Sequence, residues 1–490
     1  MQPLHRRDVL RLGVTTIGAA TFGRAFWRAA YAAPAQPGPG PYGALGPPDA
    51  NGIRLPAGFA SRVVARANEP VPGTTFPWHP APDGGAVFPT DDGGWVYASN
   101  SETPLIGGVS AVRFDPDGAV VDAYRILIGT SLNCAGGPTP WGTWLSCEEW
   151  DGGRVWECDP LVSGQGVVRP AMGAFAHEAV AVDHDDERLY LTEDKGDGAL
   201  YRFTPDAYPD LTAGLLELAV VDGLEGATAD RGGTVRWVEV PQPNPVQLPQ
   251  FPEQPQNPTR YQVPETTHFD GGEGIWCDSG VVYFSTKGDN RVWAYEPARA
   301  ELAVIYDAFA LEDPPLTGVD NIVVADSGDI FVAEDGGDLQ LVLITPDRVV
   351  APFLQVIPER LPGRPASELA GPAFSPDGSR LYFSSQRGGR GDGITYEVSG
   401  PFRAPRGGVQ PTPTETMTGV GSPSPQPPAS PTVAPSGAGT LTPGGTSGAT
   451  AGSEDDTPST GAGGAVVGAA TIAAAAALRR RSHPGGGAAS

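Results

Sequence analysis

A short apolar pattern recurs along the middle of the chain, and its spacing limits the possible folds more than any other feature of the sequence. Each copy is a run of four β-type residues that ends in small or polar side chains, as in Tyr97-Ala98-Ser99-Asn100. A second strand-like run follows most copies and stops at an acidic or proline turn. Repeats of roughly 45 to 50 residues built from short strands are typical of β-propeller blades. The copies start at Tyr97, Trp144, Tyr190, Tyr283, Phe331 and Tyr382.

The repeat predicts an all-β fold, a six-bladed β-propeller. The 67 glycines and 53 prolines favour this class over a helical bundle, because both residues interrupt helices and promote turns. The interval between Tyr190 and Tyr283 is the longest, and residues 240–265 within it are rich in proline and glutamine, which predicts an insertion. We expect residues 59–66 to supply a strand that closes the ring against the last blade. Separate β-sandwich domains are the alternative.

Residues 1–33 resemble a twin-arginine export signal. Arg6 and Arg7 precede a modestly hydrophobic stretch at residues 12–22, and Ala30-Tyr31-Ala32 fits the small-residue pattern of a signal-peptidase site. A short transmembrane anchor is the alternative, although the apolar stretch has too few residues to cross a bilayer. The sequence therefore predicts recognition by the twin-arginine export machinery and a folded domain, residues 34–403, that lies outside the cytoplasm.

The C-terminal part of the chain has a different composition. Residues 404–460 are rich in Pro, Thr, Ser and Gly, so they cannot bury enough apolar surface to order themselves, and we expect a disordered stalk or linker. Residues 461–490 hold a short hydrophobic tail followed by Arg479-Arg480-Arg481. Thr457-Pro458-Ser459-Thr460-Gly461 resembles a cell-wall sorting signal in which Thr457 replaces the leading Leu. The tail is expected to tether the protein to the membrane or to the cell wall.

The acidic balance of the chain excludes one class of partner and suggests another. With 32 basic against 57 acidic residues the formal net charge is −25, so nucleic-acid binding is not expected, because phosphate backbones require an excess of Lys and Arg. Bound cations relieve self-repulsion on this scale. The sequence lacks the short motifs of nucleotide-binding loops, serine hydrolases and zinc proteases. Bound divalent metals are one explanation of the acidity, and a solvated acidic surface is the other.

Pairing each repeat as a hairpin predicts where the acidic residues lie. Residues at equal distances from a tight turn face each other, which places Glu178 opposite Glu193 and Cys134 opposite Cys147. The first strand of a propeller blade is the innermost, so equivalent positions of successive blades meet around the axis. We expect Cys134, Glu178, Glu273 and Asp320 to converge at one mouth of the channel, surrounded by Asn100, Glu102, Glu148, Glu193 and Glu334.

Such a cluster has the donor chemistry of a metal site. Oxygen-rich groups suit Ca2+, and a thiolate among them suits a transition metal such as iron. For each acidic position the alternative is a residue that only forms a turn. Cys134 and Cys147 could also form a cross-strand disulfide in an oxidising compartment, which would remove Cys134 from a metal.

One segment, NCAGGPTPWGTWLSCEE at residues 133–149, resembles the signature of the PhoX-type secreted alkaline phosphatases. The resemblance runs from about residue 55 to residue 401. It implies a six-bladed propeller, exported by the twin-arginine route, that hydrolyses phosphate monoesters at a cluster of iron and calcium ions. Further matches are His177-Glu178, Thr192-Glu193-Asp194, Glu273-Gly274, Asp320-Asn321 and Glu334-Asp335-Gly336.

The resemblance also implies roles for individual residues. Cys134 corresponds to a thiolate ligand of iron, and no catalytic residue is implied beyond the metal ligands. The corresponding carboxylate ligands are Glu178, Glu273 and Asp320, with Asn100, Glu102 and Glu148 as weaker correspondences.

Two positions depart from the family pattern. Gly271 stands where the family has Arg, two residues before Glu273, and Ser101 stands where the family has His. The missing Arg is a phosphate clamp, and losing it could remove about 2 to 4 kcal/mol of transition-state stabilisation. Arg291 or Lys287 could replace its charge.

These observations predict an exported, monomeric, metal-dependent phosphoesterase that uses Ca2+ and Fe3+ to act on phosphate monoesters. One alternative is a calcium-dependent lactonase-like hydrolase, which would need neither iron nor a thiolate ligand. Another is a non-enzymatic cell-surface propeller with structural calcium.

Overall fold

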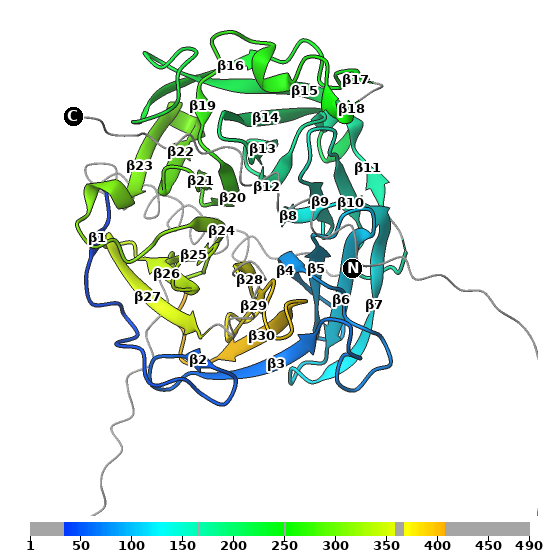
Figure 1. Ribbon diagram of the computed structural model, residues 1–490, viewed down its shortest axis with the longest axis vertical. Coiled ribbons are helices and arrows are strands. Elements are labelled where there is room, and N and C mark those ends of the chain that lie inside the picture. Colours follow the sequence, from blue (N-terminus) through cyan, green and yellow to red (C-terminus); the bar gives the residue numbers. More distant parts are fainter. Residues whose placement is uncertain (1–33, 165, 249–250, 358–366, 407–490) are drawn as a thin grey trace, which may run out of the picture. The chain divides into compact units, whose positions relative to one another are not determined.

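A computed structural model describes residues 34–164, 166–248, 251–357 and 367–406 (Figure 1). The predicted export signal, nearly all of the predicted stalk and the C-terminal tail lie outside these residues. Within them, no helix has the length and the apolar character needed to cross a membrane. Helical structure in the described part is limited to short 3-10 turns, at Pro170–Met172, Thr259–Tyr261, Pro297–Arg299 and Ala308–Ala310.

Most strands belong to antiparallel groups of four, and in all of these groups but the last, chain order is also spatial order. In the first half of the chain these are β4 (Pro82–Pro89), β5 (Trp95–Ser101), β6 (Gly107–Phe114) and β7 (Val120–Thr130); β8 (Asn133–Pro138), β9 (Trp144–Glu148), β10 (Val155–Cys158) and β11 (Val167–Val168); and β12 (His177–Asp183), β13 (Arg188–Glu193), β14 (Gly198–Ala207) and β15 (Asp210–Val221).

The second half repeats the arrangement. Its groups are β20 (Gly272–Asp278), β21 (Val281–Thr286), β22 (Arg291–Glu296) and β23 (Glu301–Asp307); β24 (Val319–Val324), β25 (Ile330–Glu334), β26 (Gln340–Ile344) and β27 (Val349–Val356); and β28 (Leu369–Phe374), β29 (Arg380–Ser385), β30 (Ile394–Ser399) and β3 (Ala60–Arg66).

The first strands of these groups form a closed ring (Figure 1). Strand β4 contacts β8, β8 contacts β12, β12 contacts β20, β20 contacts β24, β24 contacts β28, and β28 contacts β4. The second, third and fourth strands of each group lie successively further from the centre. The predicted all-β class and the propeller-like arrangement are therefore confirmed.

The last group combines strands from both ends of the folded part. Strand β3 pairs antiparallel with β30, and Arg62 lies opposite Glu397 in the register. Their side chains form an ion pair of 2.5 Å. This pairing agrees with the expectation that residues 59–66 close the ring.

The long interval between the third and fourth groups holds an insertion, as predicted. It begins earlier than residue 240, because β16 pairs with β15 and also reaches β23, joining the two groups into one sheet. The inserted strands are β16 (Gly233–Glu239), β17 (Gln247–Leu248), β18 (Phe251–Pro255) and β19 (His268–Phe269). Near the N-terminus, β1 (Gln36–Pro37) and β2 (Ile53–Arg54) both add to β27.

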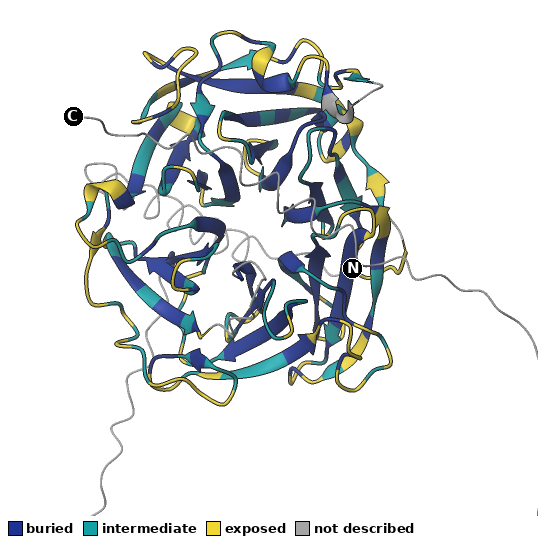
Figure 2. Cartoon of the chain, viewed as in Figure 1, coloured by how far each residue is buried: buried dark blue, intermediate teal, exposed yellow. Residues whose placement is uncertain are grey.

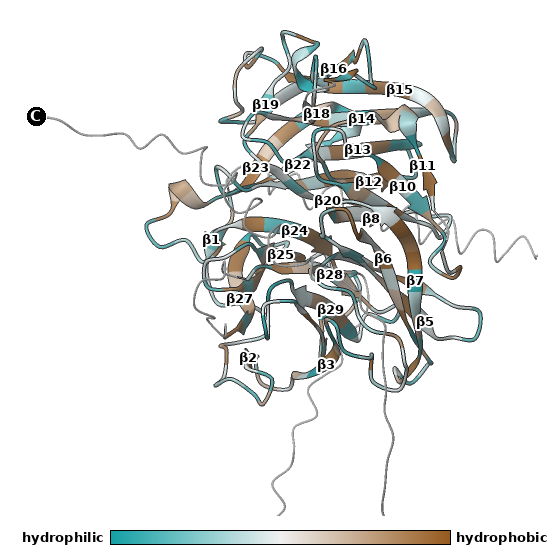
Figure 3. Ribbon diagram, turned by 45° about the vertical axis from the view of Figure 1, so that its right-hand side comes forward, coloured by the Kyte–Doolittle hydropathy of each residue, from teal (hydrophilic) through white to brown (hydrophobic). Residues whose placement is uncertain are grey.

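The residues that start the sequence repeat explain why the groups pack side by side. All of them are buried on the second strand of their group, and the strands near the centre are buried along most of their length (Figure 2). Tyr97 stacks on Tyr382 of the neighbouring group with ring centroids 5.2 Å apart. Hydrophobic residues concentrate in the strands, whereas the connecting loops are mainly hydrophilic (Figure 3). Burial of these aromatic side chains between sheets stabilises the ring.

Candidate metal centre

A β-bulge occurs at the same place in the first strand of every group. In the third group His177 pairs with Glu193 and Val180 pairs with Leu191, so Glu178 and Ala179 together face Thr192. A bulge redirects a side chain and bends its strand. The predicted pairing of Glu178 with Glu193 was therefore wrong by one residue. The residues at the first position of the bulge are Asp83, Cys134, Glu178, Glu273, Asp320 and Gly371.

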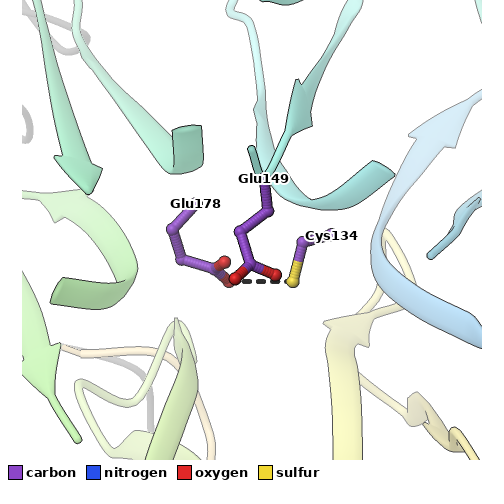
Figure 4. Close-up of side chains that lie close together, drawn as sticks. All are labelled: Cys134, Glu149 and Glu178. Atoms are coloured by element: carbon purple, nitrogen blue, oxygen red, sulfur yellow. Dashed lines mark hydrogen bonds between the residues drawn. The ribbon is translucent and has the colours of Figure 1, made fainter. Parts of the chain in front are cut away.

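The bulges bring acidic side chains and one thiol together near the centre of the ring. Figure 4 shows the carboxylates of Glu149 and Glu178 and the thiol of Cys134 directed toward one another. Ligand atoms lie within 4.8 Å of one another in four overlapping triads, which together we call the central acidic cluster: Cys134, Glu149 and Glu178; Asp83, Glu102 and Glu368; Glu178, Glu273 and Asp320; and Asp320, Asp335 and Glu368.

Burial and mutual repulsion dominate the electrostatics of this cluster. Burial first, and then the neighbouring carboxylates, raise the pKa of Glu178 well above its usual range, and the same causes raise the pKa of the Cys134 thiol. Burial also raises the pKa of Asp320 to about 7, although the attraction of Lys287 acts in the opposite direction. Anionic groups held in this way are costly to the fold unless cations neutralise them.

Two basic side chains contact the cluster. Lys287 forms an ion pair with Glu273, and its Nζ lies 3.4 Å from Asp335 Oδ2. Arg387 forms an ion pair with Glu368 and approaches Asp335 at 3.6 Å. They offset two of the eight carboxyl charges of the cluster.

The donor set fits bound metal ions. Glu178 belongs to two of the triads, and its Oε2 is buried without a hydrogen-bond partner among the described residues. Cys134 Sγ lies 3.3 Å from Glu178 Oε1 and 3.7 Å from Asp83 Oδ2. A thiol beside carboxylates suits a transition metal, and the triads made only of oxygen donors suit a hard cation such as Ca2+. All four cysteines lie in the described part and are free, so the alternative Cys134–Cys147 disulfide is not formed.

The structure brings five of the predicted ligands into the cluster: Cys134, Glu178, Glu273, Asp320 and Glu102. It does not bring three others there. Asn100 Nδ2 donates to the carbonyl oxygens of Cys134 and Ala135, while its Oδ1 accepts from Trp144 Nε1 at 2.9 Å. The nitrogen and the oxygen of this side-chain amide therefore both bond to neighbouring strands and do not face the cluster.

Glu148 and Glu193 also serve local structure instead of the cluster. Glu148 accepts hydrogen bonds from the backbone N–H groups of Ser131 and Arg154, so it fixes two turns. Glu193 forms a buried ion pair of 2.8 Å with Arg260 and accepts a hydrogen bond from Tyr201. Glu334, expected in the surrounding ring, likewise accepts from backbone N–H groups. The bulge is the physical reason, because it moves the facing residues out of simple register.

Sequence reasoning missed Asp83, Glu149, Asp335 and Glu368 as members of the cluster. Asp83 occupies the bulge of the first group, so applying the hairpin argument to the repeat at Tyr97 would have found it. Glu149 and Asp335 each lie two residues after the position that faces a bulge. Glu368 has no such signal, since it enters the cluster through an isolated bridge to Asp335.

Of the two basic residues considered as replacements for the missing arginine, one reaches the cluster. Arg291 is held by Asp289 at 2.7 Å and by Asp307 at 3.0 Å, away from the triads. Lys287 donates its backbone N–H to the carbonyl oxygen of Gly271 and extends its side chain to Glu273. Lys287 is therefore the residue placed near the position that the arginine would occupy.

Comparison with solved structures supports the architecture. PhoX from Pseudomonas fluorescens, determined in complex with vanadate, a transition-state analogue, is 16% identical, with a TM-score of 0.56 over 71% of this chain and 96% of that chain. A gluconolactonase from Xanthomonas campestris is 13% identical, with a TM-score of 0.43 over 74% of this chain and 99% of that chain. At 16% identity the likeness to PhoX shows a shared fold.

The sequence itself identifies the family. No curated protein sequence matches the chain. The family described as alkaline phosphatase PhoX matches residues 99–158 and 151–389, which together exceed half of the chain and include the bulges at Cys134, Glu178, Glu273 and Asp320. The chain therefore belongs to the PhoX alkaline phosphatase family, and it is a phosphoric ester hydrolase.

Proposed function

We propose that the protein hydrolyses phosphate monoesters at the central acidic cluster, with Ca2+ and Fe3+ bound by its carboxylates and thiol. The observation that carries this proposal is the convergence of Cys134 with eight carboxyl groups in triads whose ligand atoms lie within 4.8 Å of one another. Bound cations would supply the positive charge that a phosphoryl group requires when it is attacked in line.

The triads favour a division of the metals. Cys134, Glu149 and Glu178 would hold Fe3+, because the thiolate is the softest donor of the cluster. Asp83, Glu102 and Glu368 offer oxygen atoms alone and would hold Ca2+. Glu178, Asp320 and Glu368 each belong to two triads, so their carboxylates would be shared between neighbouring metal sites.

Residues around the ligands would keep them in place. Gln386 Nε2 donates to Asp83 Oδ2 at 2.5 Å and to Glu102 Oε2 at 2.7 Å, which orients both carboxylates. Such supporting hydrogen bonds fix the direction of metal ligands and raise metal affinity. Lys287 and Asp335 are partly exposed, so a substrate can approach this edge of the cluster from solvent.

The wider setting is also part of the proposal. Each of the six four-stranded groups would be one blade, so the fold would be a six-bladed propeller. The twin-arginine pattern at residues 1–33 supports export, and the apolar tail at residues 461–490 supports tethering to the membrane or the cell wall. A phosphatase at this location would act on phosphate monoesters outside the cell, as a monomer.

Elemental analysis of protein exported from its native host tests the metal assignment. We expect iron and calcium in the wild type, with iron lost and calcium retained in Cys134→Ala. Cys277→Ala is the matched control, because Cys277 is a free thiol outside the triads and should keep both metals. Wild-type protein without iron, or without turnover of phosphomonoesters when both metals are bound, would contradict the proposal.

A further inference from the structure

A second ring of equivalent positions surrounds the bulges. Each lies two residues after the residue that faces a bulge, at the end of the second strand of its group. Four of these positions are acidic, one is a neutral serine, and one carries a positive charge. The residues are Glu102, Glu149, Asp194, Lys287, Asp335 and Ser385.

Lys287 is unusual in this chain for its residue type as well. The sequence contains two lysines among its 32 basic residues, and the rest are arginines. The other lysine, Lys195, pairs with Asp151 at 3.2 Å and lies outside the triads. A lysine at position 287 therefore stands out both from the acidic positions equivalent to it and from the arginines used elsewhere.

The ammonium group of Lys287 lies among carboxylates at a position that solvent reaches in part. Its side chain is 27% exposed, and Nζ lies among carboxylates from three groups, those of Glu273, Asp335 and Asp194. Gly271, beside it, has a φ of +70°, and a Cβ there would lie 3.3 Å from Asp194 Oδ1 and 3.7 Å from Lys287 Cβ. A larger residue at 271 would be strained by this positive φ and would come into van der Waals contact with the lysine stem.

Building on the phosphatase function proposed above, we infer that Lys287 binds the phosphoryl oxygens of the substrate. Glu273 makes the shortest of the three ion pairs of Lys287. When cations share the charge of Glu273, its attraction for the ammonium group weakens and an incoming anion becomes the stronger partner. An ammonium group on a flexible four-carbon stem can make this exchange, because it is a compact charge with three donors that need no fixed geometry.

A purely structural role predicts different behaviour. If Lys287 only neutralised Glu273 and Asp335, its removal would change the retention of metal and leave anion affinity unaltered once the metals are bound. If it binds the phosphoryl group, removal weakens phosphate binding while the metal content stays the same. Metal content and phosphate affinity are therefore the two quantities to measure together.

The experiment compares metal-loaded full-length wild type, Lys287→Gln, Lys287→Arg and the control Lys195→Gln. Inorganic phosphate is titrated calorimetrically, and elemental analysis gives the metal content of each sample. We expect Lys287→Gln to keep its metals and to bind phosphate 10- to 100-fold more weakly, the loss expected for one charged hydrogen bond. Lys287→Arg should stay within a few-fold of wild type, as should Lys195→Gln.

Unchanged phosphate affinity in Lys287→Gln, or loss of its metals, would overturn the inference. Failure of the proposed phosphatase function can be told apart from failure of this inference, because the calorimetric titration measures phosphate binding without turnover. Wild-type enzyme that binds phosphate through Lys287 and hydrolyses no phosphomonoester would disprove the phosphatase function and leave the role of Lys287 as an anion ligand. Wild-type enzyme that binds no phosphate would overturn both.

Discussion

The side-chain amide of Asn100 donates a hydrogen bond to the main-chain carbonyl oxygen of Cys134, across 3.1 Å and from one four-stranded group to the next. The same relationship recurs around the ring. Thr192 Oγ1 donates to the carbonyl oxygen of Glu273, and Ser285 Oγ donates to that of Asp320, each at 2.5 Å. In these three cases the residue that faces one bulge holds the bulge of the following group, so the positions of Cys134, Glu273 and Asp320 depend on a neighbouring group.

Asn100→Asp should remove this support for Cys134. A carboxylate cannot donate to the carbonyl oxygens of Cys134 and Ala135, and it would leave a buried charge beside them. We expect loss of iron and a decrease of about 3 kcal/mol in the free energy of unfolding, measured by elemental analysis and urea denaturation. Asn244→Asp is the control, since that exposed amide also donates to a carbonyl oxygen, and it should change neither quantity appreciably. Retained iron in Asn100→Asp would contradict this view.

Close approach of two bulges requires glycine at position 84. A Cβ at Gly84 would lie 2.4 Å from the Cα of Ala135 and 2.9 Å from the carbonyl oxygen of Cys134. Gly84→Ala should therefore push β4 away from β8 and destabilise the protein by about 3 kcal/mol, visible as a lower denaturation midpoint. Gly196→Ala provides the comparison, because its Cβ would meet only Asp270 Oδ1, at 3.5 Å. Equal stability of the two variants would show that the strands can adjust.

Substitutions of two carboxylates with different surroundings should show that metal content and stability can change separately. Asp83→Asn is expected to lower the calcium content, because Asp83 belongs to a triad of oxygen donors. Glu193→Gln is expected to keep all metals yet lose about 2 kcal/mol of stability, because the largely buried Arg260 loses its buried charged partner and keeps only Asp197. Calcium analysis and thermal unfolding of both variants check this. A loss of metal in Glu193→Gln would restore that residue as a ligand.

The stability of metal-free protein should fall as the pH rises toward neutrality. Burial raises the pKa of Glu334 from 4.5 to about 7, so its ionisation costs the folded state more than the unfolded state. Below the unfolded pKa the cost is absent, and above the folded pKa it is complete, at about 3 kcal/mol.

Urea denaturation of EDTA-treated protein, between about pH 4 and pH 8, measures this effect. Relative to wild type, Glu334→Gln should gain stability as the pH rises through that range, because it has no proton to lose. A difference between the two proteins that does not change with pH would disprove the assignment.

The sequence repeat was sufficient to predict the class, the ring and several members of the cluster. Buried aromatic anchors such as Tyr97 and Tyr382 must recur because each group buries the same face against its neighbours. The bulges were not predictable from counting residues, since an extra residue in one strand leaves no mark in the hydrophobic pattern. That omission misplaced Glu193. Glu368 depends on a bridge between segments distant in sequence, for which no local pattern exists.

The pairing of β3 with β30 also limits when the protein can become active. Arg62 and Glu397, which meet in that pairing, are 335 residues apart in the sequence. Bringing such distant segments together is slow and entropically costly. Because Asp83 and Glu368 share one triad, a chain that has not yet been synthesised as far as Glu368 cannot contain the complete central acidic cluster, although the residues of the triad Cys134, Glu149 and Glu178 are already present. The complete cluster therefore forms only after the last group of strands has been synthesised, so the order of translation itself delays activity until the ring can close.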